Sequence, residues 1–146
     1  MLGIIGYGGY VPRLRLSRRV VVDANAWYAP HLAGKAKGTR SMCNFDEDSL
    51  TLAVAAARDC LGAADDRRHV RGVHLASNTL PFAERLNAVV VCEALTLDPD
   101  ISAQDSGGSL RAGLSALESA LDAVRAGRGA QLLIATDHRA ARAGSS

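Results

Sequence analysis

The chain has few aromatic residues, few cysteines and no marked excess of either charge. Aromatic side chains make up 4% of its 146 residues, and 17 Lys and Arg against 15 Asp and Glu leave a formal net charge of +2. The arginines are scattered without aromatic residues between them, so the composition gives little support for a nucleic-acid interface. No apolar run reaches the roughly 18 to 20 residues of a membrane-spanning helix, and the first residues lack the features of a secretion signal. We therefore expect no nucleic-acid partner and no membrane partner.

The three cysteines, Cys43, Cys60 and Cys92, also exclude some kinds of site. They are odd in number and lie too far apart in the sequence for a zinc-binding spacing. Reduced thiols in a cytoplasmic protein are the simplest explanation, so we expect neither a disulfide nor a bound metal. Cys92 falls on the apolar face of a predicted helix, where a thiol acts as a small hydrophobic residue. Cys43 falls in a loop and is the better candidate for a reactive thiol.

Apolar residues are plentiful, at 48% of the chain, and suit a domain with a sizeable core. We expect one domain over residues 1–139 and a loose tail over residues 140–146, which are small and polar. Apolar runs predict buried strands at residues 2–10, 72–76, 101–105 and 131–136. Helical spacing predicts helices at residues 46–61, 84–97 and 108–125, while residues 17–27 are a less clear helix and residues 34–40 form a basic loop.

The helix at residues 108–125 has the clearest pattern, because its leucines recur in steps of three and four residues. This apolar stripe consists of Leu110, Leu114, Leu117, Leu121 and Val124. Alternation of strands and helices along the chain predicts an α/β fold in which helices cover a mainly parallel sheet. Chemistry in such sheets gathers beyond the carboxyl ends of the strands. That edge would carry residues 7–10, 77–82, 104–108 and 137–139.

Residues 103–113 are the most informative segment, since they join a predicted strand to the clearest helix. Gly107 and Gly108 allow a sharp turn and the close approach of a ligand, and the helix that follows points unpaired N–H groups into the turn. Such a turn can position a reactive side chain or bind an anion. A plain strand-to-helix turn is the alternative that these residues leave open. Two histidines complete the inventory: His74 in mid-strand is expected to be structural, and His138 lies near the edge without an evident acidic partner.

The run Ser-Gly-Gly-Ser-Leu-Arg-Ala at residues 106–112 resembles the nucleophile turn of the thiolase superfamily, with Ser106 in the position of the family's cysteine. Residues 3–15 resemble the opening of hydroxymethylglutaryl-CoA (HMG-CoA) synthases and of type III ketoacyl-carrier-protein synthases. Residues 44–54 are similar to a helix start of HMG-CoA synthases. The resemblance implies a three-layer α/β fold that forms one half, the amino-terminal half, of a thiolase-like protein. It also implies a coenzyme A thioester as substrate, no covalently bound cofactor, and a homo-oligomer or a thiolase-fold partner.

Two departures from the family pattern bear on activity. Asn78 occupies or neighbours the position of the family's acidic residue, and an amide cannot take up or release a proton there. Ser106 would need an adjacent base, and the family supplies its histidine and asparagine from a second half. The resemblance therefore leaves two readings: an acyltransferase component acting on carbon–carbon bonds of CoA thioesters, or a noncatalytic or truncated subunit that supports a complete thiolase-fold partner.

Two further features extend the resemblance. Lys35, Lys37 and Arg40 form a basic loop that type III synthases would place near the phosphates of coenzyme A, where paired cations suit the polyanion; a solvated loop is an equal alternative. Residues 79–83 and 109–113 match a bacterial branch whose members work with a partner built from a zinc ribbon and an OB-fold. Within that branch, thiolysis, retro-aldol cleavage or unusual acyl transfer is expected rather than mevalonate synthesis.

Overall fold

A computed structural model describes residues 2–62 and 66–139 of the chain. These residues fall into two compact units. Among the described residues, the larger unit comprises residues 2–10 and those from Glu47 to Asp137, and the smaller unit comprises Val11–Asp46 with His138 and Arg139. The expectation of one domain over residues 1–139 stays a prediction, and the expected tail at residues 140–146 lies outside the described residues. No helix of the described ranges is long and apolar enough to cross a membrane.

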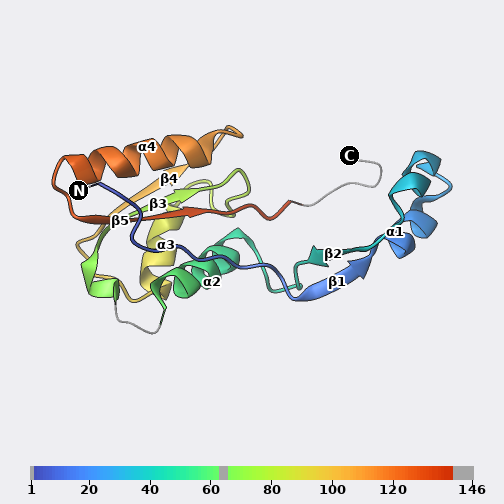
Figure 1. Ribbon diagram of the computed structural model, residues 1–146, viewed down its shortest axis with the longest axis horizontal. Coiled ribbons are helices and arrows are strands. Elements are labelled where there is room, and N and C mark those ends of the chain that lie inside the picture. The colour runs from blue at the N-terminus through green and yellow to red at the C-terminus, as the bar shows by residue number, and fades with distance from the viewer. Residues whose placement is uncertain (1, 63–65, 140–146) are drawn as a thin grey trace. The chain divides into compact units, whose positions relative to one another are not determined.

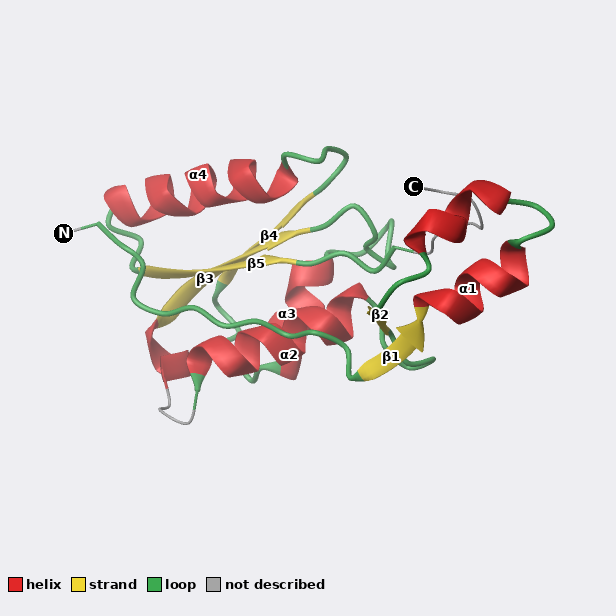
Figure 2. Cartoon of the chain, turned by 45° about the vertical axis from the view of Figure 1, so that its right-hand side comes forward, coloured by secondary structure: helices red, strands yellow, loops and turns green. Residues whose placement is uncertain are grey.

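The larger unit is built on a parallel sheet with helices on both faces (Figures 1 and 2). Its three strands lie in the order β4–β3–β5, with β3 at Val70–Ala76, β4 at Ser102–Ser106 and β5 at Ala130–Ala135. Helices α2 and α3 cover one face and α4 covers the other. They span Ser49–Leu61, Asn87–Ala94 and Ala112–Arg125, and a short 3-10 turn, η2, spans Asp66–His69. The predicted three-layer α/β architecture is confirmed.

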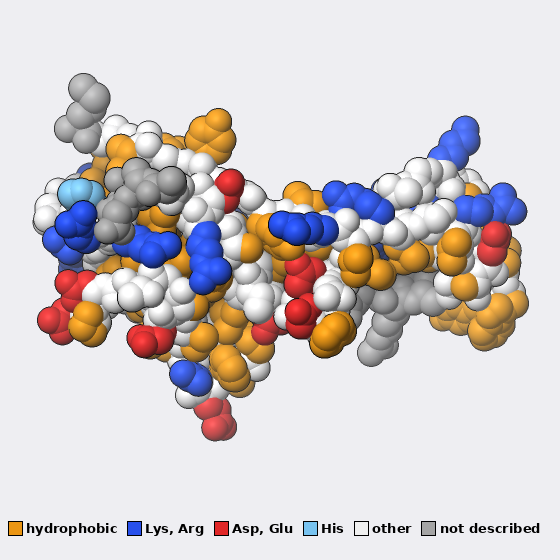
Figure 3. Space-filling view, turned by 90° about the horizontal axis from the view of Figure 1, so that it is seen from below, with side chains coloured by type: hydrophobic (Ala, Val, Ile, Leu, Met, Phe, Trp, Pro, Cys, Tyr) orange, Lys and Arg blue, Asp and Glu red, His pale blue; other side chains and the backbone are white. Residues whose placement is uncertain are grey.

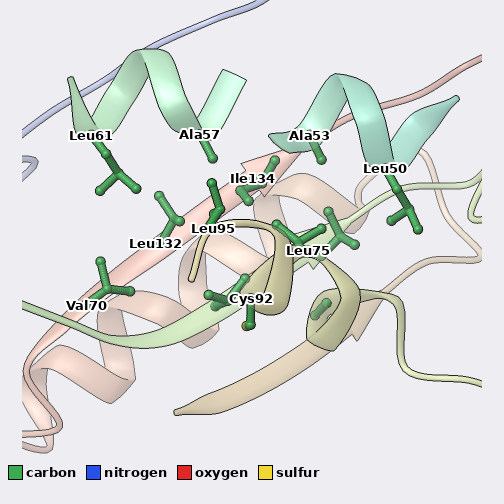
Figure 4. Close-up of a cluster of buried hydrophobic side chains, with 13 residues drawn as sticks. Leu50, Ala53, Ala57, Leu61, Val70, Leu75, Cys92, Leu95, Leu132 and Ile134 are labelled. Atoms are coloured by element: carbon green, nitrogen blue, oxygen red, sulfur yellow. The ribbon is translucent and has the colours of Figure 1, made fainter. Parts of the chain in front are cut away.

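The main core lies between the sheet and the helices α2 and α3 (Figure 4). Leu75 of β3 and Val91 of α3 are fully buried there, at 0% exposure. Helix α2 starts at a capping box in which the Asp48 carboxylate accepts a hydrogen bond from Thr51 N at 2.8 Å, while the Thr51 hydroxyl accepts one from Asp48 N. The acidic helix start expected near residue 46 therefore lies at Asp48, and the helix body matches the prediction.

Helix α4 packs on the opposite face of the sheet through small residues. Ala112, Ala116 and Ala120 are its buried positions, and methyl groups let a helix approach a sheet closely. The predicted leucine stripe lies on the other side: Leu110, just ahead of the helix, is 83% exposed and Leu114 is 57% exposed. The helix also begins at Ala112 rather than near residue 108. Leu110 and Leu114 therefore form an exposed apolar patch at the start of α4, which we call the apolar face of α4, whereas Leu117, Leu121 and Val124 are half-buried.

The strand predicted at residues 2–10 is not formed, and that prediction is wrong. The segment runs as loop along α2, where Gly9 N donates to the Asp59 carboxylate at 2.9 Å. A Cβ atom on Gly8 would lie 2.2 Å from Cys60 N, so the absence of a side chain allows this contact. Ile5 is 92% exposed. The apolar composition suggested burial in the sheet, but no described strand pairs with this segment, and its glycines pack against a helix instead.

The smaller unit contains two short antiparallel strands that the sequence pattern did not reveal. Strand β1 at Leu14–Ser17 pairs with β2 at Thr39–Met42. Between them lie α1 at Arg18–Asn25, which confirms the less clear helix, and the 3-10 helix η1 at Pro30–Lys35. The loop expected at residues 34–40 thus ends within a strand. Four-residue strands with charged and mostly exposed side chains carry no clear apolar alternation, which is why the pairing was not predicted.

Candidate functional site

The loops that follow the three strands of the larger unit meet at one edge of the sheet, as parallel pairing requires. Ala76 of β3 lies between Ser106 of β4 and Ala135 of β5 in register. The backbone pairing continues past the strands, because Ser77 N donates to Ser106 O at 2.9 Å and Thr136 N donates to Ala76 O at 3.0 Å. We call this edge, made by residues 77–79, 106–111 and 136–137, the carboxyl rim.

An aspartate organises the rim. The Asp137 carboxylate accepts hydrogen bonds from Asn78 N at 2.8 Å, from the Ser77 hydroxyl at 3.1 Å and from the Thr79 hydroxyl at 3.4 Å. One acidic side chain after β5 thereby fixes the loop after β3. The sequence placed residues 137–139 on the rim but assigned Asp137 no role; its position directly after a buried strand was the available signal.

Asn78 connects two of the rim loops. Its Nδ2 donates to Ser109 O at 3.0 Å, so the loop after β3 is tied to the turn that leads into α4. The structure thus brings together Asn78 and the turn predicted to hold the reactive position. An amide in this place can donate a hydrogen bond but cannot exchange a proton.

The turn itself is held by close packing and by backbone geometry. A Cβ atom on Gly107 would lie 2.8 Å from Ser77 O, and Gly108 has a φ of +76°, which favours glycine. The Ser109 hydroxyl accepts a hydrogen bond from Arg111 N at 3.1 Å, and Arg111 is the N-cap residue of α4. Both glycines therefore support the sharp turn that the sequence predicted, and the approach of a ligand to them stays a prediction.

Ser106 lies at the end of β4 and is half-buried. The helix start is at Ala112, so residues 107–111 separate Ser106 from the N–H groups of α4. Ser109 and Leu110 stand closer to that helix start. In residues 2–62 and 66–139, none of the rim hydrogen bonds described above joins the Ser106 hydroxyl to a His, Asp or Glu side chain. A base that could activate the hydroxyl would have to come from elsewhere.

The acidic neighbour of Ser106 has a structural role. The Asp105 carboxylate accepts hydrogen bonds from Asn87 N and Ala88 N, both at 2.7 Å, and from Asn87 Nδ2 at 2.9 Å. It caps α3, and Asn87, at 1% exposure, in turn binds the backbone of Phe82. Consecutive strand residues point to opposite faces of a sheet. Asp105 therefore faces α3 and cannot serve as a base for Ser106. The sequence pattern did not reveal this cap.

The predicted phosphate-binding residues belong to the smaller unit. Lys35 ends η1, Lys37 follows it, and Arg40 lies in β2 opposite Leu16; the three cationic side chains are exposed. On the face drawn in Figure 3, Lys and Arg side chains lie beside hydrophobic ones over this unit. Trp27, after α1, is 85% exposed. The structure supports an accessible cationic loop, and its use for phosphates stays a prediction.

The remaining candidates divide between core and surface. Cys92 is buried at 7% exposure, and burial raises the pKa of its thiol, as expected for a structural cysteine. His74 is also buried in β3, as predicted, at 7% exposure. Cys43 and His138 are half-buried residues of the smaller unit. Residues 2–62 and 66–139 hold no cluster of three or more His, Cys, Asp or Glu side chains that could bind a metal ion.

Comparison with known proteins places this geometry in a family. No family model matches the chain. The hydroxymethylglutaryl-CoA synthase of Methanobrevibacter smithii is 33% identical over 128 residues, which are 85% of this chain and 36% of that protein. A crystal structure of an HMG-CoA synthase complexed with CoA superposes with a TM-score of 0.82 and 21% identity, covering 99% of this chain and 38% of that one. The chain is thiolase-like, with HMG-CoA synthases as its relatives.

A second solved structure agrees with this assignment. The thiolase-like chain superposes on 3-oxoacyl-(acyl carrier protein) synthase III from Pseudomonas aeruginosa PAO1 with a TM-score of 0.71 and 27% identity, covering 88% of this chain and 39% of that one. The resemblance inferred from residues 3–15, 44–54 and 106–112 is thereby confirmed. The thiolase-like chain spans little more than a third of the length of these relatives.

Proposed function

We propose that the chain is the acyl-CoA-binding component of a thiolase-like acyltransferase that acts on carbon–carbon bonds of CoA thioesters. The observation that carries the proposal is the carboxyl rim, where a glycine turn, an amide side chain and the start of α4 meet. Backbone N–H groups at a helix start can polarise a thioester carbonyl, as an oxyanion hole does. The structural relative complexed with CoA supports the choice of ligand.

The phosphate end of the ligand is assigned to the smaller unit. Lys35, Lys37 and Arg40 are exposed cations on one short stretch, and cations favour the phosphates of coenzyme A. As a separate assignment, within the larger unit, we propose that a thioester binds at the rim next to Gly107 and Gly108. Coenzyme A acts here as part of the substrate, and no covalently bound cofactor is required.

Acyl transfer on this chain needs a second contributor. If Ser106 serves as the nucleophile, its hydroxyl passes a proton to a base, its oxygen bonds to the thioester carbonyl carbon, and the CoA thiolate leaves. Asp105 is engaged in capping α3 and Asn78 cannot exchange a proton, so neither supplies the base. We therefore propose that a thiolase-fold partner or a second copy of the chain completes the site, in a cytoplasmic setting.

The apolar face of α4 is the surface proposed for that partner. Leu110, just ahead of α4, and Leu114, in its first turn, are 83% and 57% exposed, and neighbouring exposed leucines favour association. A homo-oligomer would use the same face on each copy. A zinc-ribbon and OB-fold protein is a further proposed partner, based on the motif match at residues 79–83 and 109–113 alone.

A noncatalytic role is the second candidate, and specific observations favour it. Residues 107–111 separate Ser106 from the start of α4, and the family resemblance implies that Asn78 occupies or neighbours the position of an acidic residue. In that role the chain binds acyl-CoA or a partner without forming a covalent intermediate. Radiolabelled acetyl-CoA distinguishes the candidates: covalent label on Ser106 or Cys43 supports the acyltransferase, whereas label only on a co-purified partner supports the scaffold.

Binding itself is tested by charge removal. We expect the triple variant of Lys35, Lys37 and Arg40 to alanine to weaken acetyl-CoA binding several-fold, and added salt to weaken it as well. A charge-matched control replaces Arg13, Arg18 and Arg19, which lie in the same unit. Equal losses in both triple variants would show general charge attraction, and no loss in the first would contradict the assignment of these residues.

A further inference from the structure

The positive charge of the chain is concentrated in the smaller unit. Residues 11–46 carry seven Lys and Arg against two Asp and Glu, so their formal charge is +5, whereas the whole chain carries +2. The remaining residues are therefore net acidic. A concentration of one charge in one segment indicates attraction to a partner of the opposite charge.

Most of these cations are not neutralised within the chain. Arg19 pairs with Asp23 at 2.9 Å, in an exposed ion pair on α1. Five further cations are exposed and form no ion pair with residues 2–62 or 66–139: Arg13, Arg18, Lys35, Lys37 and Arg40. Their positive charge is thus available to an anionic surface.

Helix α1 presents an apolar stripe to solvent beside these cations. Val20, Ala24 and Trp27 follow one another at steps of four and three residues, which places them on one side of the helix and of the turn that ends it. Val20 is 58% exposed and Trp27 is 85% exposed, whereas Val22, on the opposite side, is buried. The helix therefore packs through one side and leaves a second apolar side open.

Two aromatic rings lie at the end of this stripe. The ring centroids of Trp27 and Tyr28 are 5.6 Å apart, and Tyr28 is 62% exposed. Indole and phenol rings combine an apolar body with a polar group, so they favour the boundary between water and lipid. Moving both rings to that boundary would remove apolar surface from water.

Cations and amphipathic rings on one unit match the chemistry of a bilayer surface. Figure 3 shows Lys and Arg side chains beside hydrophobic ones over this unit. Anionic headgroups attract Lys and Arg, and the headgroup region accepts Trp and Tyr rings. An acidic protein would complement the charge but would also need pockets shaped for the rings, whereas a fluid lipid surface adapts to them. We propose that the smaller unit binds the surface of a bilayer that contains anionic phospholipids, with Trp27 in the headgroup region.

Surface binding needs no membrane-spanning helix, because an amphipathic helix lies in the plane of the interface. It is therefore compatible with the lack of a spanning helix in the described ranges. The expectation of no membrane partner was based on the lack of a spanning run and of a secretion signal, and neither bears on surface binding. The proposal is also independent of the carboxyl rim, which belongs to the larger unit.

The fluorescence of Trp27 tests the proposal directly, since it is the only tryptophan of the chain. The full chain is titrated with vesicles of phosphatidylcholine alone and with vesicles in which about a third of the lipid is phosphatidylglycerol. We expect anionic vesicles to shift the emission of Trp27 to the blue and to reduce its quenching by acrylamide, and neutral vesicles to do neither. Co-sedimentation with the same vesicles measures binding itself.

A first pair of variants tests the charge. Arg13→Gln with Arg18→Gln removes two exposed cations of the smaller unit, and we expect binding to anionic vesicles to weaken about tenfold or more. Arg71→Gln with Arg128→Gln is the charge-matched control, because both side chains are exposed in the larger unit. Binding by this control should stay close to that of wild type.

A second pair of variants tests the apolar stripe and keeps Trp27 as the reporter. Val20→Ser with Tyr28→Ser should weaken binding several-fold and reduce the blue shift. The matched control is Ile5→Ser with Tyr7→Ser, which removes one aliphatic and one aromatic side chain, 92% and 91% exposed, from the larger unit. All four positions are exposed, and circular dichroism confirms that each variant is folded.

Four results would overturn the proposal. The first is the absence of binding to anionic vesicles. The second is binding with unchanged Trp27 emission, which would place another surface on the lipid. The third is equal weakening in a variant and its matched control. The fourth is binding to soluble polyglutamate but not to vesicles, which would make an acidic protein the partner.

Discussion

Removing the Asp105 carboxylate should destabilise the larger unit strongly, because it holds the start of α3. Asp105→Ala removes three hydrogen bonds, to Asn87 N, Asn87 Nδ2 and Ala88 N, at 2.7, 2.9 and 2.7 Å. A hydrogen bond to a charged group contributes about 1.5–3 kcal/mol, and loss of a helix cap costs about 0.5–2 kcal/mol. The three bonds share one carboxylate, so their contributions are not additive. We expect the free energy of unfolding to fall by about 3 kcal/mol.

Urea denaturation followed by circular dichroism measures this change, and two further variants sharpen it. Asp105→Asn keeps the shape and one acceptor but places an amide NH₂ group against the donors of Asn87, so we expect a loss of about 2 kcal/mol. Asp122→Ala is the control, since its carboxylate is 71% exposed and pairs only at the surface; a loss of about 0–1 kcal/mol is expected there. Asp105 variants no less stable than Asp122→Ala would refute the capping role.

Three other changes test separate parts of the structure. Burial raises the pKa of the Cys92 thiol above its ordinary value of 9.0, so the neutral thiol stabilises the fold and this stabilisation is lost as pH rises past 9. Between pH 8 and 10, the free energy of unfolding should therefore fall less for Cys92→Ala than for wild type. Equal dependence of the free energy of unfolding on pH in the two proteins would contradict this. Leu114→Asp should weaken self-association or partner binding, while Ser115→Asp at the neighbouring exposed position should not. Sedimentation velocity measures both. Equal weakening of association by the two substitutions would exclude the apolar face of α4 as the interface. Gly107→Ala brings a Cβ atom to 2.8 Å from Ser77 O and should cost about 1–3 kcal/mol in thermal or urea unfolding; a neutral result would show that the turn can relax.

Sequence patterns predicted the elements whose periodicity arises from burial. The strands β3 and β5 and the helices α2 and α3 lie close to their expected positions, because each presents an apolar face to one core. Helix α4 was also predicted, although it packs on the sheet through Ala112, Ala116 and Ala120 and not through the leucines that revealed it. The predicted strand at residues 2–10 was wrong, since composition alone cannot specify whether a strand has a partner to pair with. The strands β1 and β2 were not predicted because each has only four residues, none of them fully buried, and their burial does not alternate along the strand.

The candidate site was predicted in part. The glycine turn at Gly107 and Gly108 and its proximity to Asn78 followed from the order of strands and from the family resemblance. The roles of Asp105 and Asp137 depend on side chains that meet residues 18 and 59 positions away. Such pairings have no local signature in a single sequence, so only the folded chain reveals them.

The two faces of α4 impose different limits on mutation. The alanine face, at Ala112, Ala116 and Ala120, leaves no volume to spare, so even a modest increase in side-chain size would push the helix off the sheet. At the exposed Leu114, side-chain size is nearly free to vary in the isolated chain, and polarity matters only once another surface docks. Saturation mutagenesis of this one helix would therefore separate the requirements of folding from those of assembly, residue by residue.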